Sequence, residues 1–181
     1  MVILETQRLL LRPWQAADAA QLYRLAREPD VGPRAGWPPH TSEEDSLNII
    51  GGVLGAPETY AIVKKGCGLP VGSIGLQKPD VRLEDLPEDA RQLELGYWVG
   101  KPYWGRGYAP EAARALLERG FTALDCAAIW CAHYDFNSQS RRVIEKCGFH
   151  DQLRKETTDL LGVVHDTLFY VLTREEWQTP D

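Results

Sequence analysis

A turn with two glycines is the part of this sequence that most directly suggests ligand chemistry. It lies between an expected strand and an expected helix and consists of Trp104, Gly105, Arg106, Gly107, Tyr108 and Ala109. Glycine lets the backbone approach a ligand closely, and free amides at the start of a helix favour a phosphate. The turn therefore predicts a phosphate site, although a strand-to-helix turn can also use glycine for its geometry alone.

Two well-known phosphate patterns do not fit this turn. A P-loop requires Gly-Lys-Ser/Thr after the glycines, and that triplet is missing here. A dinucleotide site requires a third glycine and an acidic residue that ends the next strand about 20 residues further on. Asp125 lies at about that distance but precedes the expected strand, and Ala109 and Pro110 stand in the wrong places. Dinucleotide binding is therefore disfavoured.

A second segment of interest runs from Asn137 to Phe149 (NSQSRRVIEKCGF). Asn137 follows an expected strand and can cap a helix, and Gly148 can end that helix. Residues 143, 144 and 147 are apolar and face the core. By itself the segment requires no function, but it follows the glycine turn by about 30 residues, and this conjunction favours a shared site.

The elements that must position these segments alternate along the chain. The residue patterns predict strands at 2–12, 59–65, 69–77, 92–99, 127–134, 149–157 and 163–173. They predict helices at 15–27, about 43–54, 107–121 and 138–146, with Thr41 or Ser42 as the N-cap of the second. A loop rich in proline and glycine spans 29–40, and an acidic loop spans 79–90. This order predicts an α/β fold with a mixed sheet of about seven strands and helices on its faces.

Length and composition indicate one domain over residues 1–181. A formal net charge of −6 argues against nucleic acid as the main partner and weakly favours a cationic one. The four cysteines form neither a CxxC pair nor a zinc pattern, so no metal is expected. The charged N-terminus is unlike a signal peptide, and no stretch approaches the roughly 20 apolar residues that span a bilayer. We expect a reduced, cytoplasmic protein that does not enter a membrane.

Five motifs in the same order resemble the GNAT superfamily of N-acetyltransferases. The glycine turn resembles the superfamily's coenzyme A diphosphate turn, and the segment from Asn137 to Phe149 resembles its next motif. Residues 5–14 (ETQRLLLRPW), 94–98 (ELGYW) and 162–166 (GVVHD) are similar to a bacterial branch that acetylates ribosomal proteins at N-terminal alanine or serine. The resemblance extends over nearly the whole chain.

The resemblance implies acetyl-coenzyme A as co-substrate and a sheet whose central strands splay apart. Pantetheine would lie in the split, along Trp98 and Val99, and an amide near Val99 would stabilise the thioester oxygen during attack. The diphosphate would bind at the amides of Gly105 to Ala109, and Asn137 and Ser140 would border the cofactor. The superfamily often has Gln or Arg at the position of Trp104, but backbone amides bind the phosphate there.

The same resemblance assigns acid and base roles. Ile144 stands where the superfamily often has a tyrosine that protonates the leaving thiolate, so that role does not transfer. Ser140 matches a serine given this role in the ribosomal-protein branch; the alternative is an ordinary first-turn serine. Glu94 is the candidate base because strand alternation places it on the face of Gly96 and Trp98. The alternative for Glu94 is a structural or solvent-facing residue.

The acceptor is expected to be an amine that attacks in its neutral form. An α-amine, with a pKa of about 7.7–8.0, needs less help than a lysine with a pKa of about 10.4. Trp37, His40, Tyr97 and His165 are candidate acceptor contacts, with plain packing as the alternative for each.

We therefore expect direct acetyl transfer, most favourably to a protein N-terminal α-amine. A small amine (aminoglycoside, polyamine or amino acid) is the first alternative, and a non-catalytic coenzyme A-binding module is the second. The oligomeric state stays open, with a homodimer among the alternatives.

Overall fold

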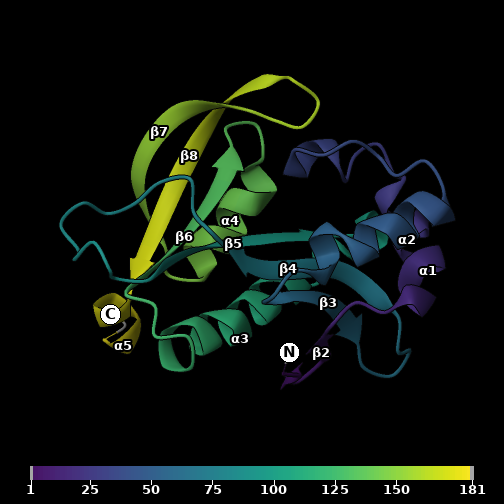
Figure 1. Cartoon of the computed structure of the whole chain (residues 1–181), viewed down its shortest axis with the longest axis horizontal. Helices are drawn as coiled ribbons and strands as arrows, with labels where there is room; N and C mark the ends of the chain where they lie inside the picture. The colour runs from purple at the N-terminus through teal and green to yellow at the C-terminus, as the bar shows by residue number, and fades with distance from the viewer. Residues whose placement is uncertain (1, 180–181) are drawn as a thin grey trace.

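Within residues 2–179, which the computed structural model describes, eight strands form one mixed sheet (Figure 1). Their order in the sheet is β1-β2-β3-β4-β5-β6-β8-β7. The β5–β6 pair is parallel, and the other neighbouring strands run antiparallel. The strands are β1 (Leu4–Glu5), β2 (Leu9–Arg12), β3 (Thr59–Lys64), β4 (Pro70–Gln77), β5 (Gln92–Val99), β6 (Ala128–Tyr134), β7 (His150–Thr158) and β8 (Val164–Thr173).

Helices cover both faces of the sheet, as the sequence predicts. One face carries α3 (Tyr108–Thr122) and α4 (Ser138–Lys146), and the opposite face carries α1 (Ala19–Ala26) and α2 (Glu43–Gly51) (Figure 1). A short helix, α5 (Arg174–Gln178), follows β8. Among the helices within residues 2–179, none has the length and apolar character needed to cross a bilayer.

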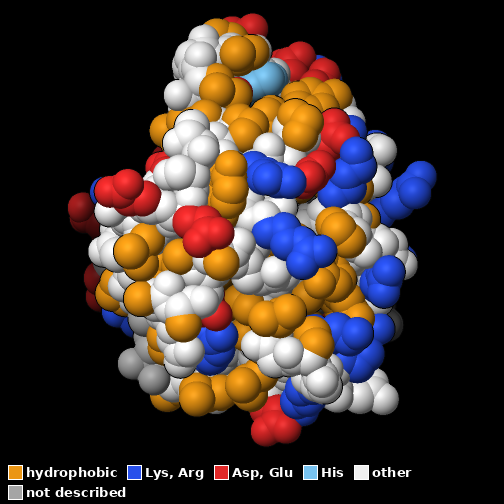
Figure 2. All heavy atoms as spheres, turned by 90° about the vertical axis from the view of Figure 1, so that its right-hand side faces the viewer, with side chains coloured by type: hydrophobic (Ala, Val, Ile, Leu, Met, Phe, Trp, Pro, Cys, Tyr) orange, Lys and Arg blue, Asp and Glu red, His pale blue; other side chains and the backbone are white. Residues whose placement is uncertain are grey.

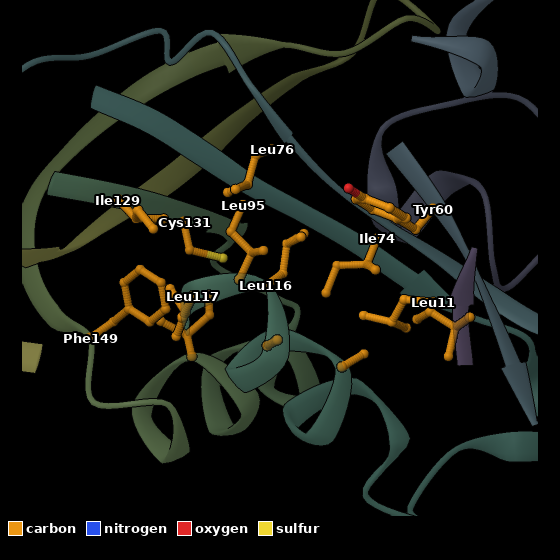
Figure 3. Close-up of a cluster of buried hydrophobic side chains, with 14 of the residues drawn as sticks. Leu11, Tyr60, Ile74, Leu76, Leu95, Leu116, Leu117, Ile129, Cys131 and Phe149 are labelled. Carbon is orange, nitrogen blue, oxygen red and sulfur yellow. The ribbon is translucent and has the colours of Figure 1, made fainter. Parts of the chain in front are cut away.

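Strand alternation divides the interior into a large core on one face and two smaller ones on the other. Beneath the sheet in Figure 3, Leu116 and Leu117 of α3 point toward Leu95 and the neighbouring strand residues. On the opposite face, one cluster forms around Trp14 under α1 and α2, and another forms around Trp130 under the 79–90 loop. The space between these two smaller clusters lies over β5 and β6, where the sheet splits.

The prediction of a single strand over residues 2–12 is wrong. The chain turns back at Thr6, whose N–H donates to the Leu9 carbonyl at 3.0 Å and whose hydroxyl accepts from the Leu9 N–H at 3.0 Å. As a result β1 and β2 pair antiparallel, with Leu4 opposite Leu11, and the sheet gains an eighth strand. The turn contains no glycine or proline, so the usual turn signals were missing.

The helix-end predictions were closer to the structure. Ser42 caps α2 by accepting a hydrogen bond from the Asp45 N–H at 2.9 Å. Asn137 caps α4, and Gly148 follows its C-terminus with φ +87°, a left-handed conformation that favours glycine. The helix expected over 15–27 is regular only from Ala19, because residues 16–18 form a 3₁₀ turn.

Candidate active site

The parallel strands β5 and β6 separate in the middle of the sheet. They pair only from Gln92–Ala128 to Glu94–Trp130, and beyond these residues each strand keeps a partner on one side alone. A cavity of about 630 Å³ lies at this split. Its walls come from both faces of the sheet, including Tyr97 and Ser140 on one face and Glu94 and Trp98 on the other. Two reactants that enter from opposite faces can therefore meet between the strands.

The glycine turn forms one end of this cavity. Gly105 and Gly107 have φ of +71° and +76°, and α3 begins at Tyr108. No side chain caps this 15-residue helix, so its first backbone N–H groups are free to bind an anion. Gly105, Gly107, Tyr108 and Ala109 line the cavity, whereas the Arg106 guanidinium lies over the Tyr103 ring at 5.9 Å. The turn has the geometry expected of a diphosphate cradle.

The last residue of β5 presents its backbone to the same cavity. The Gly100 N–H donates to the Val71 carbonyl on the β4 side at 2.8 Å. Because successive strand residues direct their backbone groups to opposite sides, the Val99 N–H and carbonyl face the split instead. Consistent with this, the Val99 carbonyl accepts from the Trp104 Nε1–H at 2.6 Å, which leaves the Val99 N–H available as a donor. Trp104 thus braces the strand end against the glycine turn.

Tyr97 and Ser140 form a hydrogen-bonded pair inside the cavity. The Tyr97 hydroxyl lies 2.8 Å from Ser140 Oγ and donates to the Ser140 carbonyl at 3.1 Å. Burial raises the pKa of Tyr97 well above its ordinary value, so the phenol stays protonated. Asn137 Oδ1 accepts from the Ser140 N–H at 3.2 Å and fixes the start of α4. Ile144, one turn later, is buried in the core.

Glu94 lies on the opposite face of β5 and also lines the cavity. Burial raises the pKa of Glu94 above its ordinary value, and the Asp80 charge raises it further. A hydrogen bond from the Asp80 backbone N–H and the Lys155 charge offset only part of this rise. A carboxyl whose pKa rises toward neutrality is a better proton acceptor near pH 7. Gly96 stands between Glu94 and Trp98, and a Cβ there would have no heavy atom within 4 Å. The missing side chain leaves room beside the carboxylate.

Three of the four residues expected to contact the acceptor lie behind the cavity wall. Trp37 packs on the edge of Trp98 at 5.4 Å between ring centroids, and His40 is buried with Nδ1 2.8 Å from Ser46 Oγ. Burial lowers the pKa of His40, so the ring is held neutral. His165 bonds to Asp159 at 2.8 Å and stacks on Tyr134, which does line the cavity. These three side chains support the wall; Tyr97, the fourth, lies in the cavity but toward α4.

Loops supply lining residues that sequence patterns did not single out. They include Arg34, Ala35 and Asp80; Thr157 and Thr158, at the end of β7, also line the cavity. The 32–40 loop is tied to α4, because Asn137 Nδ2 donates to the Arg34 carbonyl at 3.1 Å. It is also tied to the β7–β8 turn, because the Leu160 N–H donates to the Gly36 carbonyl at 3.0 Å. Loop contacts of this kind have no periodic signal in a sequence.

Comparisons with known proteins agree with this geometry. Residues 8–150 match the family model described as "Acetyltransferase (GNAT) domain". An uncharacterized N-acetyltransferase, p20 of Bacillus licheniformis, is 25% identical over 98% of this chain and 99% of its own. The fold is similar to that of Mycobacterium smegmatis RimJ in complex with CoA-disulfide (TM-score 0.77, 23% identity, covering 99% and 90% of the two chains). It is also similar to that of the ribosomal-protein-S5-alanine acetyltransferase from Vibrio fischeri (TM-score 0.74, 16% identity, 98% and 99%).

The chain belongs to the GNAT family and is an acetyl-coenzyme A-dependent acyltransferase. The matched residues run from Arg8 to His150 and include the glycine turn, the split strands and α4.

Proposed function

We propose that this GNAT acetyltransferase transfers acetyl directly to the α-amine of a polypeptide N-terminus. The observation that carries the proposal is the cavity at the split. It brings Glu94 from one face of the sheet and the Tyr97–Ser140 pair from the other to the same space. An acceptor amine and a thioester can meet there directly, with no need for a covalent enzyme intermediate.

The donor side of the cavity fits acetyl-coenzyme A. The free amides at the start of α3 suit the diphosphate, and residues 95–99, which have no partner strand on the β6 side, suit the pantetheine arm. The Val99 N–H would stabilise the negative charge that develops on the thioester oxygen. When bound, the co-substrate supplies the activated acetyl group, and these residues hold and orient it.

Proton transfers then follow from the positions of the side chains. As the amine nitrogen forms its bond to the acetyl carbon, Glu94 accepts the proton that nitrogen loses, directly or through a water. The C–S bond breaks, and the Ser140 hydroxyl, bonded to Tyr97, provides a proton to the sulfur. Return of the Glu94 proton through solvent to the Ser140–Tyr97 pair completes the cycle, so that one amide and one thiol are formed.

A polypeptide acceptor is supported by the surface beside the cavity. Hydrophobic side chains gather at the top of the face in Figure 2, where the β7–β8 turn lies. The exposed apolar residues of this rim are Phe136, Leu160, Leu161, Val163 and Val164. Phe136 packs on His165 at 5.6 Å, and Leu160 is bonded to the 32–40 loop. The residues that follow the first one in a peptide have side chains that can contact this rim, whereas a small polar amine has none. The similarity to the Vibrio fischeri enzyme also favours this acceptor.

An acceptor screen tests the proposal. Enzyme and acetyl-coenzyme A are incubated with peptides that begin with alanine or serine, with N-terminally blocked peptides that contain lysine, and with polyamines, amino acids and aminoglycosides. Thiol release gives the rate, and mass spectrometry locates the acetyl group. We expect acetylation at free α-amines. Turnover confined to small amines or to lysine side chains would overturn the proposal.

A variant of the apolar rim sharpens this screen. Leu160→Ser changes a side chain that is 81% exposed, so the fold should be retained. If the rim binds the peptide, KM for peptides should rise severalfold while coenzyme A affinity stays constant. An unchanged peptide KM would remove the rim from acceptor binding.

A further inference from the structure

Arg8, in the turn between β1 and β2, reaches the start of α3 more than 100 residues later in the chain. Its Nε donates to Glu111 Oε2 at 2.6 Å, and its Nη1 donates to the Arg106 carbonyl at 3.0 Å. The guanidinium carbon lies 4.9 Å above the centre of the Tyr108 ring. Arg8 is thus bound to the residues on both sides of Gly107 without lining the cavity itself.

Glu111 poses an electrostatic problem at this place. It lies in the first turn of α3, so its carboxylate is close to the amides that suit a diphosphate. Partial burial raises its pKa, but hydrogen bonds from Thr6 and Arg8 outweigh this and hold the pKa below its ordinary value, so the carboxylate is charged. A second anion at the helix start would be repelled by this charge. The Arg8 guanidinium, 2.6 Å from Glu111, neutralises it.

The contact with the Arg106 carbonyl has a geometric consequence. In a planar trans peptide the C=O and the following N–H point in opposite directions. Because Arg8 holds the Arg106 carbonyl toward itself, outside the cavity, the Gly107 N–H is directed the other way, toward the cavity that Gly107 lines. One contact therefore fixes the orientation of an amide in the anion-binding turn.

We propose that Arg8 is a positioning residue for the diphosphate of acetyl-coenzyme A: it neutralises Glu111 and aims the Gly107 amide. The proposal rests on the coenzyme A binding of the family and not on the identity of the acceptor. Arg8 acts through the turn and touches neither the thioester nor the amine.

Opposite effects of two substitutions would identify this role. Arg8→Ala exposes the Glu111 charge and frees the turn, so the Kd for coenzyme A, measured by calorimetry, should rise about tenfold. Glu111→Gln removes the repelling charge, so the Kd should stay equal or fall, and in the Arg8→Ala background it should recover much of the loss. If the contacts served only to hold the N-terminal segment on α3, both substitutions would weaken binding and the double variant would be the weakest.

Two controls separate the proposal from general damage. Arg27→Ala removes the same charge from a guanidinium that also lies over a tyrosine ring, Tyr23 at 5.6 Å, but outside the cavity, and it should leave the Kd unchanged. The Arg8→Ala loss should be the same for coenzyme A and for 3′-dephospho-coenzyme A, which keeps the diphosphate. The KM for acetyl-pantetheine, which lacks the diphosphate, should be the same for Arg8→Ala and for wild type.

Three results would overturn the proposal: a Kd for Arg8→Ala within twofold of wild type, an equal loss with acetyl-pantetheine, or a double variant that binds more weakly than Arg8→Ala. Arg8→Lys serves if Arg8→Ala fails to fold; one ammonium cannot reproduce both contacts, so an intermediate Kd is expected. Tight coenzyme A binding without acetylation of any amine would count against the proposed function and leave the role of Arg8 intact.

Discussion

Replacing Tyr97 with phenylalanine removes a single oxygen atom from the cavity and should slow acetyl transfer about 10- to 100-fold. That oxygen bonds to both the hydroxyl and the carbonyl of Ser140. A buried polar group left without its partner costs about 1–3 kcal/mol. If that cost falls on the transition state, each 1.4 kcal/mol corresponds to a tenfold lower kcat. The aromatic ring, which packs against the core, is unchanged.

A double-mutant cycle with Ser140→Ala distinguishes a shared role from two separate ones. If Tyr97 and Ser140 form one proton-donating unit, Ser140→Ala should lower kcat by about 10- to 1,000-fold, and the double variant should be no slower than the slower single variant. The assay is thiol release at saturating acceptor, with coenzyme A affinity measured separately. Tyr23→Phe, which removes a phenol oxygen outside the cavity, is the matched control.

Two results would refute this reasoning. Additive losses would mean that the two hydroxyls act independently. A Tyr97→Phe enzyme within twofold of wild type from pH 6 to 9 would mean that solvent protonates the thiolate and that the pair is structural. A fall in Tm of Tyr97→Phe with unchanged kcat would support the structural role.

The remaining predictions concern the base and the turn. Glu94→Gln should abolish the acidic limb of the pH–rate profile, because that limb reports the titration of the base and burial raises the pKa of Glu94. An acidic limb that persists in this variant would exclude Glu94 as the base. Because the folded pKa of Glu94 lies above the unfolded one, wild type loses stability as pH rises from the unfolded pKa through the folded pKa. The Tm of Glu94→Gln relative to wild type should therefore rise over this interval and level off above it; the opposite trend in thermal melts would contradict the burial of the charge. Gly105→Asp should weaken coenzyme A binding more than Gly107→Asp does. Both glycines have positive φ. A Cβ at residue 105 would meet open space beside the cavity, whereas a Cβ at residue 107 would lie 3.4 Å from Arg8 Nη2. Equal Kd values for the two variants by calorimetry would contradict this geometry.

Local patterns in the sequence were sufficient to predict most of the fold. Apolar alternation, the Ser42 and Asn137 caps and Gly148 locate strands and helices because each depends on residues a few positions apart. The split of β5 from β6 came from the family resemblance, and it is confirmed by pairing that stops at Glu94 and Trp130. The turn at Thr6 escaped prediction because a side chain closes it where no glycine or proline marks it.

The cavity was harder to predict because its members come together only in the folded chain. Alternation alone places Tyr97 opposite Glu94 and Trp98, but the partner it meets there, Ser140, belongs to a helix that begins 41 residues later than Tyr97. Arg34 and Asp80 reach the cavity from loops that have no period to detect. His40 has the chemistry of a base, yet its partner is Ser46, six residues away, and its ring is buried.

The position of Ile144 shows why motif matching and geometry give different answers about the acid. Matching by position finds an apolar residue where the superfamily often has a tyrosine, and the structure buries that residue in the core. The structure instead places the phenol of Tyr97, a residue of β5, against the first turn of the same helix, α4. A thiolate requires a donor at one point in space, and no chemical reason ties that donor to one position in the chain. An apolar residue at position 144 therefore does not argue against a proton donor for the thiolate, and our proposal assigns that role to the Ser140 hydroxyl, bonded to Tyr97.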